Sequence, residues 1–118
     1  MKPSPLLCLA PVLAACQPLP SAETAEPTTQ AHGRAFAQAS CGGCHAVDTY
    51  GTSTNRNAPP FGAIVNQEGL TAETLSSWLR DAHNYPQEMQ FHLGPREVDQ
   101  LVAYMLTLRD PNYRPPVQ

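Results

Sequence analysis

The chain has 118 residues, which is enough for one domain and leaves little room for a second. Its 7 basic and 10 acidic residues give a formal net charge of −3, and the basic residues are scattered rather than clustered. An acidic chain without a basic patch is not expected to bind nucleic acid. The sequence shows no paired carboxylates, no nucleophile beside a base and no phosphate-binding loop. We therefore predict neither an enzymatic activity nor a small-molecule substrate.

The N-terminus has the order of an export signal. Met1-Lys2 precede an apolar stretch, Leu6 to Ala15, which is too short to span a bilayer. The stretch ends in Leu13-Ala14-Ala15-Cys16, which resembles the lipobox of bacterial lipoproteins. We interpret residues 1–15 as a signal peptide and Cys16 as a lipidation site that tethers the protein to a membrane in the bacterial periplasm. A conventional signal cut nearby is the alternative, and it would leave Cys16 as a free thiol.

Three further segments follow the predicted signal peptide. Residues 16–28 hold the lipid-attachment cysteine and a stretch rich in Pro, Ala, Thr and Glu without an apolar period, which predicts a flexible tether. Residues 29–110 carry the helical patterns and form the predicted domain. Residues 111–118 begin with proline and are predicted to be a disordered tail.

The chemistry of the chain is concentrated in Cys41-Gly42-Gly43-Cys44-His45. Two cysteines three positions apart, with a histidine directly after the second, form the attachment pattern of c-type haem. Each thiol adds to one vinyl group of the porphyrin, and the histidine reaches the iron from the proximal side. The pattern predicts one haem c, attached covalently through Cys41 and Cys44 and ligated by His45.

Two other interpretations of the same motif were weighed. A zinc site needs four ligands, and beyond the motif the mature chain offers only His32, His83 and His92, without a second Cys-x-x-Cys. A redox dithiol of the thioredoxin type needs a βαβ context, which the helical patterns do not provide. The haem interpretation is favoured, and it agrees with the export signal, because haem is joined to apocytochrome outside the bacterial cytoplasm.

Helical patterns lie on both sides of the motif. Residues 29–39 are good helix formers with a cap at Thr28 or Thr29. Residues 46–69 carry Gly, Asn, Thr, Ser and two adjacent prolines, which predicts a long loop that needs the haem as its support.

Two more helices are predicted after this loop. Thr71 is placed as the N-cap of the second, whose apolar stripe is formed by Leu75, Trp78, Leu79 and Ala82. The third begins at Gly94-Pro95 and ends before Pro111. Its apolar stripe is formed by Val98, Leu101, Val102, Met105 and Leu108.

The order of motif and helices resembles the class I cytochrome c family, and the likeness covers about residues 29–110. It implies an all-α, small cytochrome c fold, in which three main helices and long loops surround one covalently bound haem. In this family the first and last helices cross at a glycine and pack aromatic side chains, which would bring Gly33 and Phe36 against Tyr104. Three amphipathic helices that merely share a core would explain these matches equally well without the haem motif.

The second axial ligand is predicted to be Met89. In class I cytochromes the distal methionine comes from the loop before the last helix, a few residues after a proline, and Tyr85-Pro86-Gln87-Glu88-Met89 resembles that loop. His83 and His92 are the alternatives, whereas Met105 lies on an apolar stripe and is expected in the core. Gln90 follows Met89 where family members often have proline. A thioether ligand would favour ferrous iron and raise the reduction potential.

Further contacts to the haem are implied by the resemblance. The ring nitrogen of the proximal histidine that does not bind iron is normally held by a hydrogen bond. In the family the acceptor is a proline carbonyl shortly after the motif, which matches Pro59, with Phe61 packing on the porphyrin; adjacent prolines in a surface turn are the alternative. Trp78 and Tyr85 are expected to line the haem or bond its propionates, or else to be plain core.

Three functions are compatible with these residues. The first is a monohaem carrier that moves single electrons between periplasmic redox proteins, with His45 and Met89 as axial ligands. The second is an electron-transfer subunit of a larger dehydrogenase or reductase, which would use the same residues. The third is a haem sensor or peroxidase with an open distal site, which requires that Met89 does not bind iron.

Overall fold

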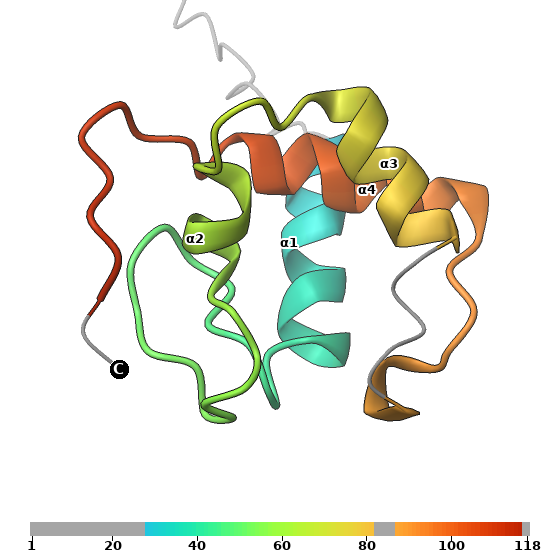
Figure 1. The fold of residues 1–118 in the computed structure, drawn as a ribbon. Helices are drawn as coiled ribbons and strands as arrows, with labels where there is room; N and C mark the ends of the chain where they lie inside the picture. Colours follow the sequence, from blue (N-terminus) through green and yellow to red (C-terminus); the bar gives the residue numbers. More distant parts are fainter. Residues whose placement is uncertain (1–27, 82–86, 117–118) are drawn as a thin grey trace, which may run out of the picture.

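The computed structural model describes residues 28–81 and 87–116, and the regular elements in these two ranges are helical (Figure 1). Three helices are long, and a short helix and a 3₁₀ turn complete the set, which confirms the predicted all-α, small cytochrome c fold with three main helices. Within these ranges no helix is both long enough and apolar enough to cross a membrane. In chain order the elements are α1 (Thr29–Ser40), α2 (Phe61–Val65), α3 (Ala72–Asp81), η1 (Gln87–Met89) and α4 (Pro95–Leu106).

Several sequence predictions fall on residues outside these ranges. They concern the signal peptide, the lipidation of Cys16 and most of the tether. They also concern Ala82, His83 and Tyr85 in the segment between α3 and η1. These remain predictions.

Helix α4 is the element on which the others pack, because it contacts each of α1, α2 and α3. Figure 1 shows α4 crossing α1, with α3 packed on α4 at the upper right of the view and α2 at the left. The buried faces meet at Ala37, Leu75, Val98, Leu101 and Met105. Most of the two predicted apolar stripes therefore lies in the core, whereas Trp78 is 38% exposed and Ala82 lies outside the described residues.

The crossing of α1 and α4 is close because Gly33 has no side chain. A Cβ atom added to Gly33 would collide with the carbonyl oxygen of Gln100 and would lie 2.8 Å from the Cβ of Tyr104. Phe36 is partly buried and packs on the same core, which Tyr104 joins. The crossing at a glycine, with aromatic side chains beside it, is as the family resemblance implied.

The helix ends are set by the capping residues that the sequence predicted. The Thr28 hydroxyl accepts a hydrogen bond from the backbone N–H of Ala31 (3.2 Å), which starts α1. Thr71 and Thr74 bond each other's backbone N–H groups at the start of α3, at 3.0 and 3.2 Å. Pro95 occupies the first turn of α4 after Gly94.

The long loop after the motif is more ordered than predicted, because it contains α2. The start of α2 is held beside the motif, where the Phe61 N–H donates to the Ala46 carbonyl oxygen at 2.8 Å. Within the loop, the hydroxyl of buried Ser53 accepts from the Ala46 N–H at 3.0 Å. Five residues are too few to show a helical period, so the sequence pattern could not separate α2 from the loop around it.

The chain after α4 also differs from the prediction. The sequence predicts a disordered tail over residues 111–118, yet Tyr113 in this segment stacks on Tyr50 with ring centroids 5.6 Å apart. The Tyr50 hydroxyl donates to Asp110 at 2.6 Å, which ties this segment to the long loop. The hydrogen bond raises the pKa of Tyr50 and lowers that of Asp110. The contact joins residues 60 positions apart, so local sequence patterns gave no sign of it.

Gly33→Ala is expected to lower the free energy of unfolding by about 1–3 kcal/mol, because the added methyl group forces α1 and α4 apart. Gln30→Ala is the matched control, since Gln30 is exposed on the same helix and its replacement should change the free energy by less than about 0.5 kcal/mol. Thermal unfolding followed by far-ultraviolet circular dichroism measures both. An unchanged midpoint for Gly33→Ala would show that the crossing is not tight.

Candidate haem-binding site

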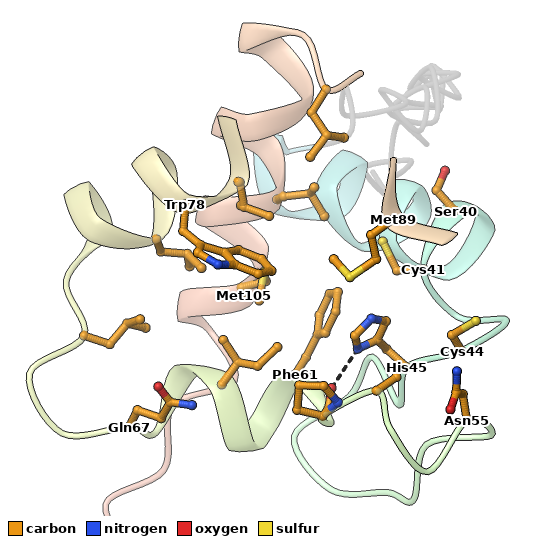
Figure 2. Close-up of a pocket in the computed structure, with 18 of the residues that line it drawn as sticks. Ser40, Cys41, Cys44, His45, Asn55, Phe61, Gln67, Trp78, Met89 and Met105 are labelled. Carbon is orange, nitrogen blue, oxygen red and sulfur yellow. Dashed lines mark hydrogen bonds between the residues drawn. The ribbon is translucent and has the colours of Figure 1, made fainter. Parts of the chain in front are cut away.

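A largely apolar cavity of about 590 Å³ lies between α3, α4, α2 and the motif (Figure 2). Its volume falls in the range of cavities that hold drug-sized and cofactor-sized ligands. Seven of the residues predicted from the sequence line it: Cys41, Cys44, His45, Pro59, Phe61, Trp78 and Met89. The eighth, Tyr85, lies outside the described residues. The cavity therefore gathers residues that are spread over almost fifty positions of the chain.

The motif follows directly after helix α1 and lies at the edge of this cavity. The helix ends at Ser40, and the motif continues it as a hydrogen-bonded turn in which the N–H groups of Cys44 and His45 donate to the Cys41 carbonyl oxygen at 3.1 and 2.9 Å. Cys41 is half-buried and Cys44 is exposed, and both are free thiols. Burial, together with the neighbouring Cys44, raises the pKa of the Cys41 thiol to about 11, so that this thiol is neutral at pH 7.

A hydrogen bond to the backbone orients the imidazole of His45. Its Nδ1 lies 2.7 Å from the Pro59 carbonyl oxygen, which is the hydrogen bond expected from the sequence. Because Nδ1 donates to a carbonyl, Nε2 carries the free lone pair. Figure 2 shows the ring between this bond and the cavity. The hydrogen bond thus occupies Nδ1 and leaves Nε2 as the nitrogen that could bind a metal.

Phe61 supports the same imidazole from the side. Its ring is buried at the start of α2, and its centroid lies 5.6 Å from that of His45, with the rings tilted by 53°. The position of the ring is fixed by the backbone bond from Phe61 to Ala46, the residue after His45. Pro59 and Phe61 therefore act together, one as hydrogen-bond acceptor and one as packing surface.

Met89 lines the cavity from the connection between α3 and α4. It is the last residue of η1, and the turn is closed by a bond of 3.0 Å from the Gln90 N–H to the Gln87 carbonyl oxygen. Figure 2 shows its thioether pointing into the space that His45 also faces. Met105 lines the cavity too, but its side chain is only 1% exposed and belongs to the core of α4, as expected.

Trp78 lines the cavity from α3, although its side chain is 38% exposed. Its neighbours on the same helix stripe, Leu75 and Leu79, are buried and also line the cavity. The indole therefore closes the outer part of the wall and does not lie in the core.

Sequence reasoning missed a second set of lining residues. They come from loops and helix faces that carry no motif, and the polar members among them have neutral side chains. Asparagines in a loop carry no signal in the sequence that distinguishes a cavity wall from a surface turn. The missed residues include Asn55, Asn57, Ile64, Gln67, Leu70, Thr74, Phe91 and Leu93.

The two alternative chemistries of the motif find no support in the described residues. Their His, Cys, Asp and Glu side chains form no group of three or more that could hold a metal ion. The described residues also contain no β-strand, so they do not provide the βαβ context of a redox dithiol.

The donor set fits a covalently attached haem. Such a group requires two thiols at the cavity edge, an imidazole held by a carbonyl, a thioether on another wall and an apolar lining, and the site offers all of these. In this site Cys41 and Cys44 would attach the ring.

Comparison with known proteins identifies the family. A protein-family model described as cytochrome c matches residues 30–109. No curated protein and no solved structure matches the chain. The match covers the domain that the helices and the cavity define, and the family binds haem c through cysteines. The chain therefore belongs to the cytochrome c family and is a haem-binding electron-transfer protein.

Proposed function

We propose that this protein is a monohaem electron carrier of the bacterial periplasm, with His45 and Met89 as the axial ligands and no enzymatic activity of its own. The observation that carries the proposal is the hydrogen bond between His45 Nδ1 and the Pro59 carbonyl, in a cavity that the Met89 thioether also lines. This hydrogen bond leaves Nε2 of His45 available to bind iron on one wall of the cavity, and the Met89 thioether would provide a soft ligand on another wall. When bound, the haem supplies a one-electron Fe(II)/Fe(III) couple.

The residues of the chain tune this couple in two ways. The carbonyl of Pro59 holds the imidazole in one tautomer and makes it a better donor. The cavity lining is apolar or neutral, with no Asp, Glu, Lys or Arg among its described members. Such surroundings disfavour the more highly charged oxidised state, and a thioether ligand acts in the same direction. The apolar lining and the thioether ligand therefore both suit a carrier that accepts electrons readily and passes them to an acceptor of higher potential.

The redox partners are proposed to be other electron-transfer proteins, one donor and one acceptor. A carrier needs a surface at which the haem edge comes close to a partner, and the exposed thiol of Cys44 marks such a place. The proposed tether, through a lipid on Cys16, would hold the domain near a membrane surface where donors and acceptors reside.

Met89→Leu tests the axial ligation. The variant keeps the volume of the side chain but removes the sulfur, so the ferric protein should lose the long-wavelength absorption band of thioether-bound iron. The ferrous variant should also take up carbon monoxide rapidly, which the native protein should not. Met105→Leu is the matched control, because it makes the same change at a buried residue and should keep the native spectrum.

Either of two results would change the assignment. A native spectrum in Met89→Leu would remove Met89 from the ligand set and direct attention to His83 and His92. Rapid uptake of carbon monoxide by the native ferrous protein would instead indicate an open distal site, and with it a sensor or peroxidase.

Replacing the two cysteines together tests covalent attachment. After maturation in a competent exporting host, the native protein should retain its haem on a denaturing gel stained for peroxidase activity. Cys41→Ser and Cys44→Ser should each retain haem through one thioether bond, whereas the double variant should lose it. A colourless native band, or pigment extracted by acid acetone, would contradict the whole assignment.

Cys16→Ser tests the tether. The native protein should fractionate with membranes, because two or more acyl chains anchor firmly where one alone is marginal, and the variant should be released to the soluble fraction. Cys8→Ser is the control, since it changes a cysteine within the predicted signal peptide and should leave fractionation unaltered. Immunoblots of the two fractions give the readout. Equal distribution of the native protein and Cys16→Ser would favour a conventional signal peptide.

A further inference from the structure

The segment that follows α4, residues 108–113, packs against α2 and against the start of the long loop. We call it the C-terminal segment. The ring of Tyr113 lies on Gly62 of α2, where an added Cβ atom would be 2.9 Å from the ring and would collide with the carbonyl oxygen of Thr49. The same ring stacks on that of Tyr50 in the loop, with the two planes inclined by 22°. Three parts of the chain therefore meet closely at Gly62.

The side chain of Asn66, at the C-terminal end of α2, joins this helix to the C-terminal segment. Its Nδ2 group donates to the carbonyl oxygens of Gly62 at 2.8 Å and Leu108 at 3.3 Å. Its Oδ1 atom accepts from the backbone N–H of Asp110 at 2.9 Å. One bond thus lies within α2 and two cross to the C-terminal segment. An ionised carboxylate of the same shape could keep only the bond from Asp110, because it has no N–H group to donate.

Two more side chains of the region strengthen this connection. The guanidinium of Arg109 donates to the carbonyl oxygen of Val65, the last residue of α2, at 3.3 Å, and to that of Leu70 at 2.5 Å. The carboxylate of Asp110 accepts from the Tyr50 hydroxyl at 2.6 Å. The C-terminal segment is therefore bonded to the end of α2 and to the loop on either side of this helix.

The position of α2 matters because the groups that contact His45 lie at its start. Phe61 is the first residue of α2, and its ring centroid lies 5.6 Å from that of the imidazole. Pro59, whose carbonyl oxygen lies 2.7 Å from Nδ1 of His45, comes two residues earlier. A helix of five residues is too short to be stable by itself, so its position depends on bonds to other parts of the chain.

We propose that the C-terminal segment positions the axial histidine and that Asn66 is the positioning residue through which it acts. The contacts run from this segment through Asn66 to α2, and from the start of α2 to His45. By holding α2 in place, Asn66 keeps the Pro59 carbonyl at bonding distance from Nδ1, and with it the tautomer that leaves Nε2 for the iron. This inference rests on the proposed function, in which His45 is an axial ligand.

The test follows the exchange of the His45 Nδ1 proton with solvent in the reduced, isotope-labelled holoprotein, by nuclear magnetic resonance. The backbone N–H of Leu101, in the core of α4, is the internal reference for opening of the whole fold. Asn66→Asp keeps the size of the side chain but removes both donated bonds, and it should raise the ratio of the His45 rate to the Leu101 rate by about tenfold. Asn66→Ala adds no charge and should raise the ratio in the same way.

Thr28→Ala is the matched control for a general loss of stability. It removes the cap of α1, a helix that packs on α4 and not on α2, so the fold is weakened without a change beside His45. The exchange ratio should stay at the native value.

A second pair of variants decides the question if changes at Asn66 prevent folding. Tyr113→Leu removes the aromatic ring that lies on Gly62 and should also raise the exchange ratio. Tyr113→Phe keeps the ring and removes a buried hydroxyl that has no hydrogen-bond partner within the described part of the chain. This conservative variant should keep the native ratio.

A native ratio in Asn66→Asp, or in Tyr113→Leu where the Asn66 variants do not fold, would overturn the proposal. An equal rise in Thr28→Ala would also overturn it, because loss of stability alone would then free the imidazole. Failure of the proposed function would be seen separately. Haem missing from the denaturing gel, or rapid uptake of carbon monoxide by the native ferrous protein, does not depend on these exchange rates.

Discussion

The close crossing of α1 and α4 at Gly33 holds together the parts of the molecule on which the site depends. Helix α1 ends at Ser40 and passes directly into the cysteine motif, so its position on α4 determines where both thiols lie. Helix α4 contributes Leu101 and Met105 to the inner wall of the same cavity. A separation of the two helices would therefore move the attachment residues away from the wall that faces them.

A set of hydrogen bonds connects helix α4 and the long loop to His45 and the residues that follow it. The Tyr104 hydroxyl, on α4, donates to the Val47 carbonyl oxygen at 2.8 Å, two residues after the histidine. Burial raises the pKa of Tyr104, so the hydroxyl remains a donor at neutral pH. Ser53 holds Ala46, and Pro59 holds the imidazole itself. The proximal side is thus fixed at several points, by Pro59 in the cavity wall and by Tyr104 and Ser53, which do not line the cavity.

The distal side is built differently. Met89 comes from η1, a single short turn, and lies in a connection between α3 and α4 rather than on a long helix. The position of the Met89 side chain therefore depends on the loop around it, whereas that of His45 depends on the core.

Local patterns in the sequence were sufficient to predict the three main helices and the chemistry of the motif. The spacing of two cysteines and a histidine, the caps at Thr28 and Thr71 and the stripes of α3 and α4 depend on residues a few positions apart. Hydrogen bonds and side-chain contacts within one or two helical turns explain why such signals can be read directly. The pairing of His45 with Pro59 spans 14 positions, and family resemblance was needed to anticipate it.

What only the tertiary structure decided involves residues that meet across long stretches of chain. The helix α2, the packing of Tyr113 on Tyr50 and the place of Asn55, Asn57 and Gln67 in the cavity wall belong to this group. Loop residues have no period that points to a face, and their positions follow from the way the loop closes on the helices. The motif thus specified the chemistry by itself, whereas the shape and neutrality of its surroundings required the fold.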